Sequence, residues 1–251
     1  MVLEAGEEYE QVLGFLKKPG GRVCCAERLL MNEKILILSA FGQFGTYKAN
    51  ISAEVARRLD RKKVADYRVV SLIFPCDITE PSDNRGRALL DLAQERGAVG
   101  ILSLGMSSAS TGFWFETRAR NELHQEKYYP NKERVPVDPS RPMDEVLHMD
   151  ITPWNFETFK REWESVRICP VELSSDEGGF CCEQLAYQVL SEQYLQTPAE
   201  RLPYTFIHLP CCPEAVENPM AFLRSGKTLL TTETVERGLH ELLTVANLPA
   251  R

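Results

Sequence analysis

The sequence predicts an α/β fold: a three-layer α/β/α sandwich in one domain, with a mostly parallel central sheet. From residue 34 onward, short apolar runs alternate with segments of helical periodicity, which is the pattern of strands and helices that follow one another along a chain. The apolar runs are nearly continuous, as in strands that are buried on both faces. The chain has 251 residues, a length that suits a single α/β domain.

The predicted strands are short segments rich in Val, Ile, Leu, Phe and Tyr. The first is almost wholly aliphatic, the third leads directly into Gly105, and the last ends at the proline turn of Pro210. β-Branched and aromatic residues of this kind favour buried strands. The predicted strands are residues 35–39, 67–74, 99–104, 167–173 and 204–209.

The predicted helices show start and stop signals as well as periodicity. Ser52 followed by Glu54 is typical of a helix N-terminus, and Gly97 is the residue type expected just past a helix end. Leu185 and Val189 lie four residues apart, which places both on one apolar face. A threonine-rich start with two glutamates marks the last helix. The predicted helices are residues 52–61, 84–96, 155–163, 180–194 and 232–248.

Two segments fall outside this pattern. Residues 1–33 contain a Pro-Gly-Gly turn, and Met31 lies just before the first predicted strand. We expect either an N-terminal extension, separate from an α/β domain at residues 34–251, or a coding start at Met31. Residues 122–150 are polar and proline-rich without periodicity, so we expect a long loop or irregular insertion, of the kind that often forms a lid.

Composition excludes several classes of function. The net charge of −7 and pI near 5.3 give no basic surface for nucleic acid. No apolar run approaches the length of a membrane span, and the N-terminus lacks the pattern of a signal peptide. We therefore expect a cytoplasmic protein that binds neither nucleic acid nor membrane.

The chain has eight cysteines, most of them in Cys-Cys pairs that match no zinc spacing. In a reducing compartment we expect each to be a small buried hydrophobe, without a metal.

The stretch SSDEGGFCCEQLAYQVL, residues 174–190, places Cys181 and Cys182 at the predicted start of a helix, after two glycines. Free N–H groups and the positive end of the helix dipole stabilise a thiolate there. Two buried structural cysteines after a glycine-containing loop would give the same sequence pattern, so both interpretations remain open at this point.

A nucleophile of this kind needs a base and an orienting group. His208 lies near the end of an apolar strand, where α/β sheets present their sites, although a structural core histidine would fit there too. Glu116 is flanked by aromatic residues, which suggests a half-buried carboxylate; a lone strand glutamate is otherwise commonly a surface residue.

Several separate segments together resemble the pyroglutamyl peptidase I family of cysteine peptidases, over most of residues 34–251. The segment at 174–182 resembles the family's nucleophile motif, and that at 206–210 its histidine motif. The others are a first loop at 39–45, continued at 48–52, and the glutamate segment at 105–121, GMSSASTGFWFETRARN.

The resemblance implies a function and a site. It implies a peptidase that removes N-terminal pyroglutamate from peptides through an acyl-enzyme intermediate, without metal or organic cofactor. Counting from Gly178 and Phe180, the family's nucleophile falls on Cys182, and Cys181 is then a packing residue. His208 would take the thiol proton and Glu116 would orient the imidazole.

The family's substrate pocket uses aromatic residues from the first loop and from the nucleophile loop. The resemblance therefore implies that Phe41, Phe44 and Phe180 form an apolar slot for the flat 5-oxoproline ring, although core packing would also account for these rings. Met106 stands where many members have a glutamine that contacts the lactam.

Departures from the family pattern keep two rivals open. Met106 and Glu177 suggest a divergent cysteine amidohydrolase with a different small amide substrate, since a charge at Glu177 would disfavour a nearby thiolate. The second rival interpretation is a catalytically silent relative that serves as a binding protein. Assembly into a homo-oligomer is left open by the sequence.

Overall fold

The computed structural model describes residues 33–77, 84–127, 132–175 and 178–249. The chain divides into two units, Met1–Glu33 and Lys34–Arg251, and every element below belongs to the second. Of the predicted extension at residues 1–33, the described residues include only Glu33, and Glu177 also lies outside them.

The central sheet has seven strands, in the order β10-β5-β11-β4-β1-β3-β2, within the part of the chain that the structure describes. Strands β11, β4, β1 and β3 are parallel to one another, whereas β2 is antiparallel to β3, and β5 is antiparallel to β11 but parallel to β10. The predicted mostly parallel sheet is confirmed. The strands are β1 (Lys34–Phe41), β2 (Lys63–Val64), β3 (Tyr67–Phe74), β4 (Ala98–Met106), β5 (Phe113–Glu116), β10 (Val171–Ser174) and β11 (Tyr204–Leu209).

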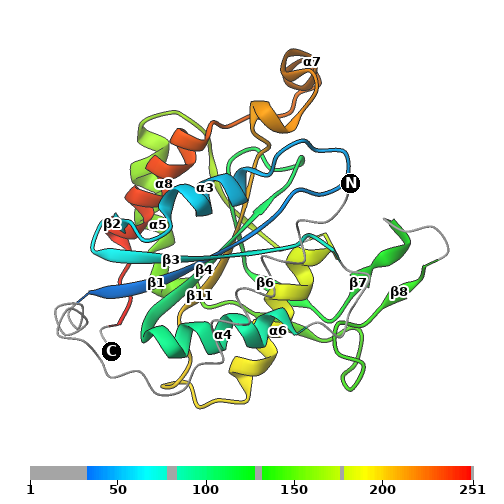
Figure 1. Ribbon diagram of the computed structural model, residues 1–251, viewed down its shortest axis with the longest axis vertical. Helices are drawn as coiled ribbons and strands as arrows, with labels where there is room; N and C mark the ends of the chain where they lie inside the picture. The colour runs from blue at the N-terminus through cyan, green and yellow to red at the C-terminus, as the bar shows by residue number, and fades with distance from the viewer. Residues whose placement is uncertain (1–32, 78–83, 128–131, 176–177, 250–251) are drawn as a thin grey trace. The chain divides into compact units, whose positions relative to one another are not determined.

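Helices cover both faces of this sheet, so the predicted three layers are confirmed. Helices α3, α5 and α8 lie on one face, and α4 and α6 on the other (Figure 1). Each face has its own apolar core, and every residue of β4 and β11 is buried because both of its faces are covered. The helices are α3 (Ile51–Leu59), α4 (Arg85–Arg96), α5 (Phe156–Ser165), α6 (Cys181–Tyr194) and α8 (Thr232–Val245).

Local signals explain where these helices begin and end. The Asn50 side chain accepts the Ser52 N–H at the start of α3, and Asn84 accepts the Arg87 N–H at the start of α4, as N-cap residues do. Gly97 ends α4 with φ of 62°, a left-handed conformation that glycine adopts easily. None of the described helices is long and apolar enough to cross a membrane.

The predicted strand at residues 167–173 is wrong in its first half. Arg167 has a φ of 54° just after α5 ends, and Pro170 has no N–H to donate to a neighbouring strand. The strand β10 therefore begins only at Val171. The sequence analysis also missed several short elements, among them strands β2 and β5, helix α7 (Pro219–Arg224) and the 3-10 turns η2 (Thr152–Trp154) and η3 (Pro213–Ala215).

The segment at residues 122–150 contains more regular structure than a loop. Short strands there pair outside the main sheet: β7 pairs with β8, and β9 pairs with β6, which lies just before the segment. Asn121 holds the following turn, because its amide donates to the Asp138 carbonyl and its oxygen accepts the Asp138 N–H. These elements are β6 (Arg118–Arg120), β7 (Leu123–His124), η1 (Gln125–Lys127), β8 (Arg134–Val135) and β9 (Val146–His148).

Candidate active site

Three of the predicted site residues lie where parallel strands of the sheet end. Phe41 is the last residue of β1, Met106 is the last residue of β4, and His208 is the last but one of β11. Because these strands run in the same direction, their carboxyl ends meet at one edge of the sheet. That edge is the usual place for a site in an open α/β sheet.

Glu116 and His208 form a buried pair on the face of the sheet that α6 covers. In the antiparallel pairing of β5 with β11, Trp114 lies opposite His208, so Glu116 occupies the diagonal position on the same face. Glu116 Oε1 lies 2.8 Å from His208 Nδ1, and the two side chains are 0% and 6% exposed. An ionised carboxylate only accepts hydrogen bonds, so Nδ1–H donates and Nε2 is left for other chemistry.

Cys182 lies in the first turn of α6, as predicted. The turn before the helix contains Gly178 and Gly179, with φ of 83° and 68°, and Phe180 is the N-cap. A side chain at residue 179 would also collide with the His124 ring, so only glycine fits there. At a helix start, the backbone N–H groups and the positive end of the helix dipole favour a thiolate.

Gly105 lies between this cysteine and the histidine. A Cβ atom at residue 105 would lie 2.9 Å from Cys182 Sγ and 3.0 Å from His208 Nε2. Both atoms therefore lie close to the same point, which any side chain at residue 105 would occupy. The structure thus brings Cys182, His208 and Glu116 together in this order.

A cavity of about 290 Å³ opens at this point. Its lining includes all of the predicted site residues except Glu116, which lies behind His208. The Phe44 and Phe180 rings both line the cavity and lie next to each other, with centroids 6.1 Å apart and planes tilted by 48°, so the cavity has an aromatic side. Its lining residues are Phe41, Phe44, Tyr47, Asn50, Cys76, Met106, Ser107, Ser108, Trp114, Gly178, Phe180, Cys181, Cys182 and His208.

Sequence reasoning missed Trp114, Tyr47 and Cys76 in this lining. Trp114 could have been found, because it lies two residues before Glu116 and strand side chains alternate. Its indole N–H donates to Glu172 Oε2 at 2.7 Å, which fixes the ring. Tyr47 packs against Phe44, with centroids 5.1 Å apart and planes tilted by 52°, but it lies in an irregular loop without a sequence pattern that indicates where its side chain points.

Cys181 is not the simple packing residue that we expected. It forms a disulfide with Cys76, which follows β3, and both residues line the cavity. The structure leaves Cys182 outside this bond. The expectation of buried hydrophobes fits the remaining described cysteines better, since burial raises the pKa of the Cys211 thiol to about 11 and also raises the pKa of Cys169 and Cys212.

Glu183, directly after Cys182, is a buried carboxylate that sequence reasoning overlooked. Its side chain is 1% exposed, it accepts the Arg120 backbone N–H, and the Arg120 guanidinium lies 3.4 Å away. Burial raises the pKa of Glu183 to about 7, against the opposing effect of hydrogen bonds from Arg120 and the Gly179 N–H. The carboxylate connects the first turn of α6 to β6.

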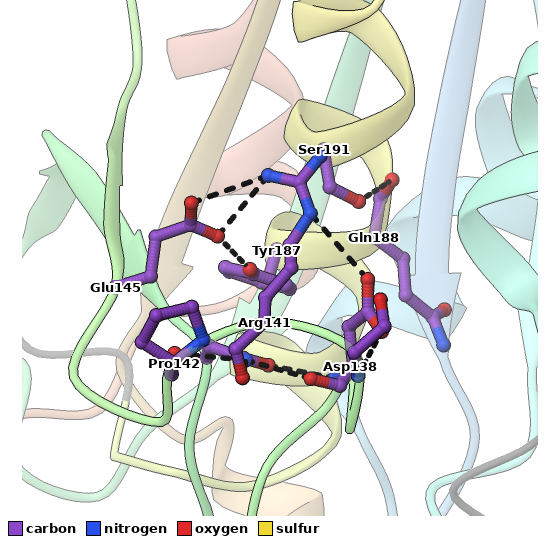
Figure 2. Close-up of polar contacts among 9 residues, drawn as sticks. Asp138, Arg141, Pro142, Glu145, Tyr187, Gln188 and Ser191 are labelled. Atoms are coloured by element: carbon purple, nitrogen blue, oxygen red, sulfur yellow. Dashed lines mark hydrogen bonds and ion pairs between the residues drawn. The ribbon is translucent and has the colours of Figure 1, made fainter.

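The segment at residues 122–150 is attached to the helix that carries Cys182. Figure 2 shows Tyr187 of α6 donating its hydroxyl proton to Glu145. Arg141 lies 3.1 Å from Glu145 and 3.5 Å from Asp138 (Figure 2). The hydrogen bond from Tyr187, helped by Arg141, lowers the pKa of Glu145. Residues 138–145 are thus held to one another by charged contacts and joined to α6 by the hydrogen bond from Tyr187.

The described residues contain no group of three or more His, Cys, Asp or Glu side chains that could hold a metal ion. The arrangement can instead support chemistry by a thiol, an imidazole and a carboxylate. Such a set activates a sulfur nucleophile for attack on a carbonyl carbon.

Solved structures of similar fold come from bacteria and archaea. Pyroglutamyl peptidase I from Bacillus amyloliquefaciens superimposes with a TM-score of 0.66 at 20% identity, over 87% of this chain and 99% of that one. Pyrrolidone carboxyl peptidase from Thermococcus litoralis gives a TM-score of 0.66 at 18% identity, over 85% of this chain and 93% of that one. These likenesses show the fold.

Sequence comparisons lead to the same group. The pyrrolidone-carboxylate peptidase of Bacillus mycoides is 24% identical over 215 residues, 85% of this chain and 93% of the relative. That of Bacillus thuringiensis is 24% identical over 82% of this chain and 89% of the relative. The family model for pyroglutamyl peptidase matches residues 33–241. The chain therefore belongs to the pyroglutamyl peptidase family of cysteine-type omega peptidases.

Proposed function

We propose that this protein removes pyroglutamate from the N-terminus of peptides, with Cys182 as nucleophile, His208 as base and Glu116 as the group that orients the imidazole. The observation that carries the proposal is the approach of Cys182 Sγ and His208 Nε2 to one point above Gly105, while Glu116 binds Nδ1 from behind. Family membership supports the same reaction.

The reaction follows from this arrangement. His208 Nε2 takes the Cys182 proton, and Sγ attacks the carbonyl carbon of pyroglutamate to form a tetrahedral intermediate. The imidazolium then gives its proton to the departing peptide amine, which leaves a thioester on Cys182. Water, deprotonated by His208, hydrolyses the thioester and releases pyroglutamate. Glu116 stabilises the imidazolium in both steps, and backbone N–H groups at the start of α6 are suited to the oxyanion.

The cavity supports a small, flat and uncharged end group as substrate. Phe41, Phe44 and Phe180 offer apolar faces to a lactam ring, and Met106 extends the apolar lining. An N-terminal ammonium would lose its hydration among these side chains without a paired carboxylate, so a free amino terminus is disfavoured. The blocked terminus of pyroglutamate avoids this cost.

The test is the hydrolysis of a pyroglutamyl-coumarin amide, compared with alanyl and prolyl amides, in the presence of reductant. We expect hydrolysis of the first alone, and loss of activity after iodoacetamide. Cys182→Ser should lower kcat by roughly 10³-fold or more, because serine is a far weaker nucleophile at this site.

Matched cysteine variants separate the nucleophile from its neighbours. Cys181→Ser should retain most of the activity under reducing conditions, and Cys169→Ser, a buried change outside the cavity, should behave like the wild type. Equal loss from Cys181→Ser and Cys182→Ser would show that the nucleophile is assigned incorrectly. Turnover of another amide would favour the divergent amidohydrolase. No turnover, together with slow alkylation of Cys182, would favour a silent binding protein.

A further inference from the structure

The disulfide between Cys76 and Cys181 crosses the wall of the candidate active site. Cys76 belongs to the turn after β3, and Cys181 is the first residue of α6. The bond joins segments 105 residues apart, and both cysteines line the same cavity as Cys182 and His208. Disulfides are rare in proteins of reducing compartments, and those that occur there are usually transient and catalytic or redox-sensing.

Contacts other than the bond also hold the backbone on either side of Cys76. Their Cα atoms are 5.8 Å apart, within the usual range for a disulfide. Arg85, at the start of α4, donates to the Pro75 carbonyl at 2.9 Å and to the Asp77 carbonyl at 2.7 Å, on either side of Cys76. Arg85 itself is only 3% exposed, so a buried residue holds the turn through these two hydrogen bonds.

Helix α4 is itself packed closely on α6. The Gly86 N–H donates to the Gln188 side chain at 3.2 Å, and the Gln188 backbone leaves no space for a side chain at residue 86. The turn that carries Cys76 is thus held by α4, and α4 is held against α6, the helix that begins with Cys181. Two thiols fixed in this way close a disulfide with little further loss of chain entropy.

We propose that Cys76 and Cys181 are a reversible dithiol–disulfide site, modified by a small disulfide of the glutathione class, and that the bond fixes the wall of the substrate cavity. The half-buried Cys76 is the accessible partner, whereas Cys181 is 1% exposed. The helix dipole at the start of α6 favours the thiolate that completes the exchange.

The exchange balances in two steps. The Cys76 thiolate attacks one sulfur of glutathione disulfide, which forms a mixed disulfide and releases one glutathione thiolate. The Cys181 thiolate then attacks Cys76 Sγ, which forms the protein disulfide and releases the second glutathione. One glutathione disulfide is reduced to two glutathiones, and two protein thiols are oxidised.

The first test detects the bond itself and does not depend on peptidase activity. The Cys182→Ser protein, which lacks the competing nucleophile, is equilibrated with glutathione mixtures, blocked with N-ethylmaleimide and mapped by mass spectrometry without reduction. We expect peptides joined through Cys76 and Cys181 at oxidising ratios, and separate blocked peptides at reducing ratios. Absence of the joined pair at every ratio, or a pair that reduced glutathione cannot open, would overturn the proposal.

The second test measures the effect on the cavity, and it rests on the proposed function. The KM of the wild type for the pyroglutamyl amide should be about three- to ten-fold higher in the reduced protein, because a wall that must be ordered on binding weakens binding. KM does not depend on the fraction of active molecules, so partial modification of Cys182 leaves it unchanged. Cys76→Ala should show the higher KM at both ratios, and Cys169→Ser should follow the wild type.

The outcomes distinguish the two proposals. An equal KM in the two redox states, with the bond mapped, would refute the role of the bond in the cavity. Absence of any pyroglutamyl hydrolysis would refute the proposed function, while the mapped peptides would still decide whether Cys76 and Cys181 exchange with glutathione.

Discussion

The carboxylate of Glu116 lies 2.8 Å from the Nδ1 atom of His208, although 92 residues separate the two in the chain. The antiparallel pairing of β5 with β11 produces this contact, since it places the two side chains diagonally on one face of the sheet. In an otherwise mostly parallel sheet, the reversed direction of β5 therefore determines which carboxylate meets the imidazole.

Glu116→Gln should lower kcat for the pyroglutamyl amide by roughly 10²- to 10⁴-fold, with a much smaller change in KM. The amide fits the same space but carries no charge to stabilise the imidazolium. It can also donate to Nδ1, which would turn Nε2 into the protonated nitrogen and remove the base. Steady-state kinetics measure both constants.

The control for this change is Glu157→Gln, the same substitution on the exposed surface of α5. It should leave kcat and KM at their wild-type values. Wild-type kcat in Glu116→Gln would mean that the imidazole needs no carboxylate, and the proposed role of Glu116 would be wrong.

Gly105→Ala should reduce kcat strongly while the protein stays folded. The added methyl group would lie 2.9 Å from Cys182 Sγ and 2.9 Å from His208 Cδ2, so the two side chains must move apart. Misplacement by about 1 Å commonly costs a factor of about 10² in rate. Thermal denaturation should show a folded protein, and the rate of Cys182 alkylation at neutral pH should fall together with kcat.

Gly226→Ala is the matched glycine variant outside the site. Gly226 has a φ of 81° but open space around it, so the change strains the backbone without entering the cavity. It should lower stability slightly and leave kcat unchanged. If Gly105→Ala kept wild-type kcat, the nucleophile and the imidazole would not meet above residue 105.

Deletion of residues 1–30 should leave both kcat and the melting temperature within error of the full chain. We propose that residues 1–33 are not part of the domain core, because the first strand of the sheet begins at Lys34 and its partners β3 and β4 follow it in sequence. Circular dichroism and the coumarin assay measure the two properties. A truncated protein that misfolds or loses activity would show that the extension contributes to the domain.

The three-layer arrangement could be predicted because buried parallel strands appear in the sequence as nearly continuous apolar runs. The β4 run and the Gly97 helix end, for example, follow from neighbouring residues alone. Two features could not be predicted from local sequence. The antiparallel direction of β5 depends on which strand Phe113–Glu116 pairs with, and that is decided by the rest of the fold. The late start of β10 depends on the left-handed conformation of Arg167, which its neighbours in the chain do not indicate.

The candidate site, too, could be predicted only in part. The positions of the site residues at strand ends and at the helix start could be predicted from the spacing of the family motifs. The Cys76–Cys181 bond was not, because its partners are 105 residues apart and no local pattern connects them. The burial of Glu183 was missed as well, since the residue type alone predicts an exposed side chain.

Glu183 should make the wild type lose stability as the pH rises from about 4.5 to 7. Its pKa is about 7 in the folded protein, above the ordinary value of 4.5, so between these values the folded state holds a proton that the unfolded state has lost. The favourable contribution is fully present below pH 4.5 and is lost as the pH rises through 7. Its size is roughly 3 kcal/mol.

Glu183→Gln removes this titration, because the amide is neutral at every pH and its oxygen still accepts the Arg120 N–H. The free energy of unfolding of the wild type minus that of the variant should therefore fall by roughly 2–3 kcal/mol between pH 4.5 and pH 7.5. Urea denaturation at several pH values measures this difference, and other titrating groups cancel because both proteins share them. Glu157→Gln should show no such trend. Parallel stability curves for the wild type and Glu183→Gln would mean that the buried carboxylate is already ionised at pH 4.5 and is held in that state by Arg120.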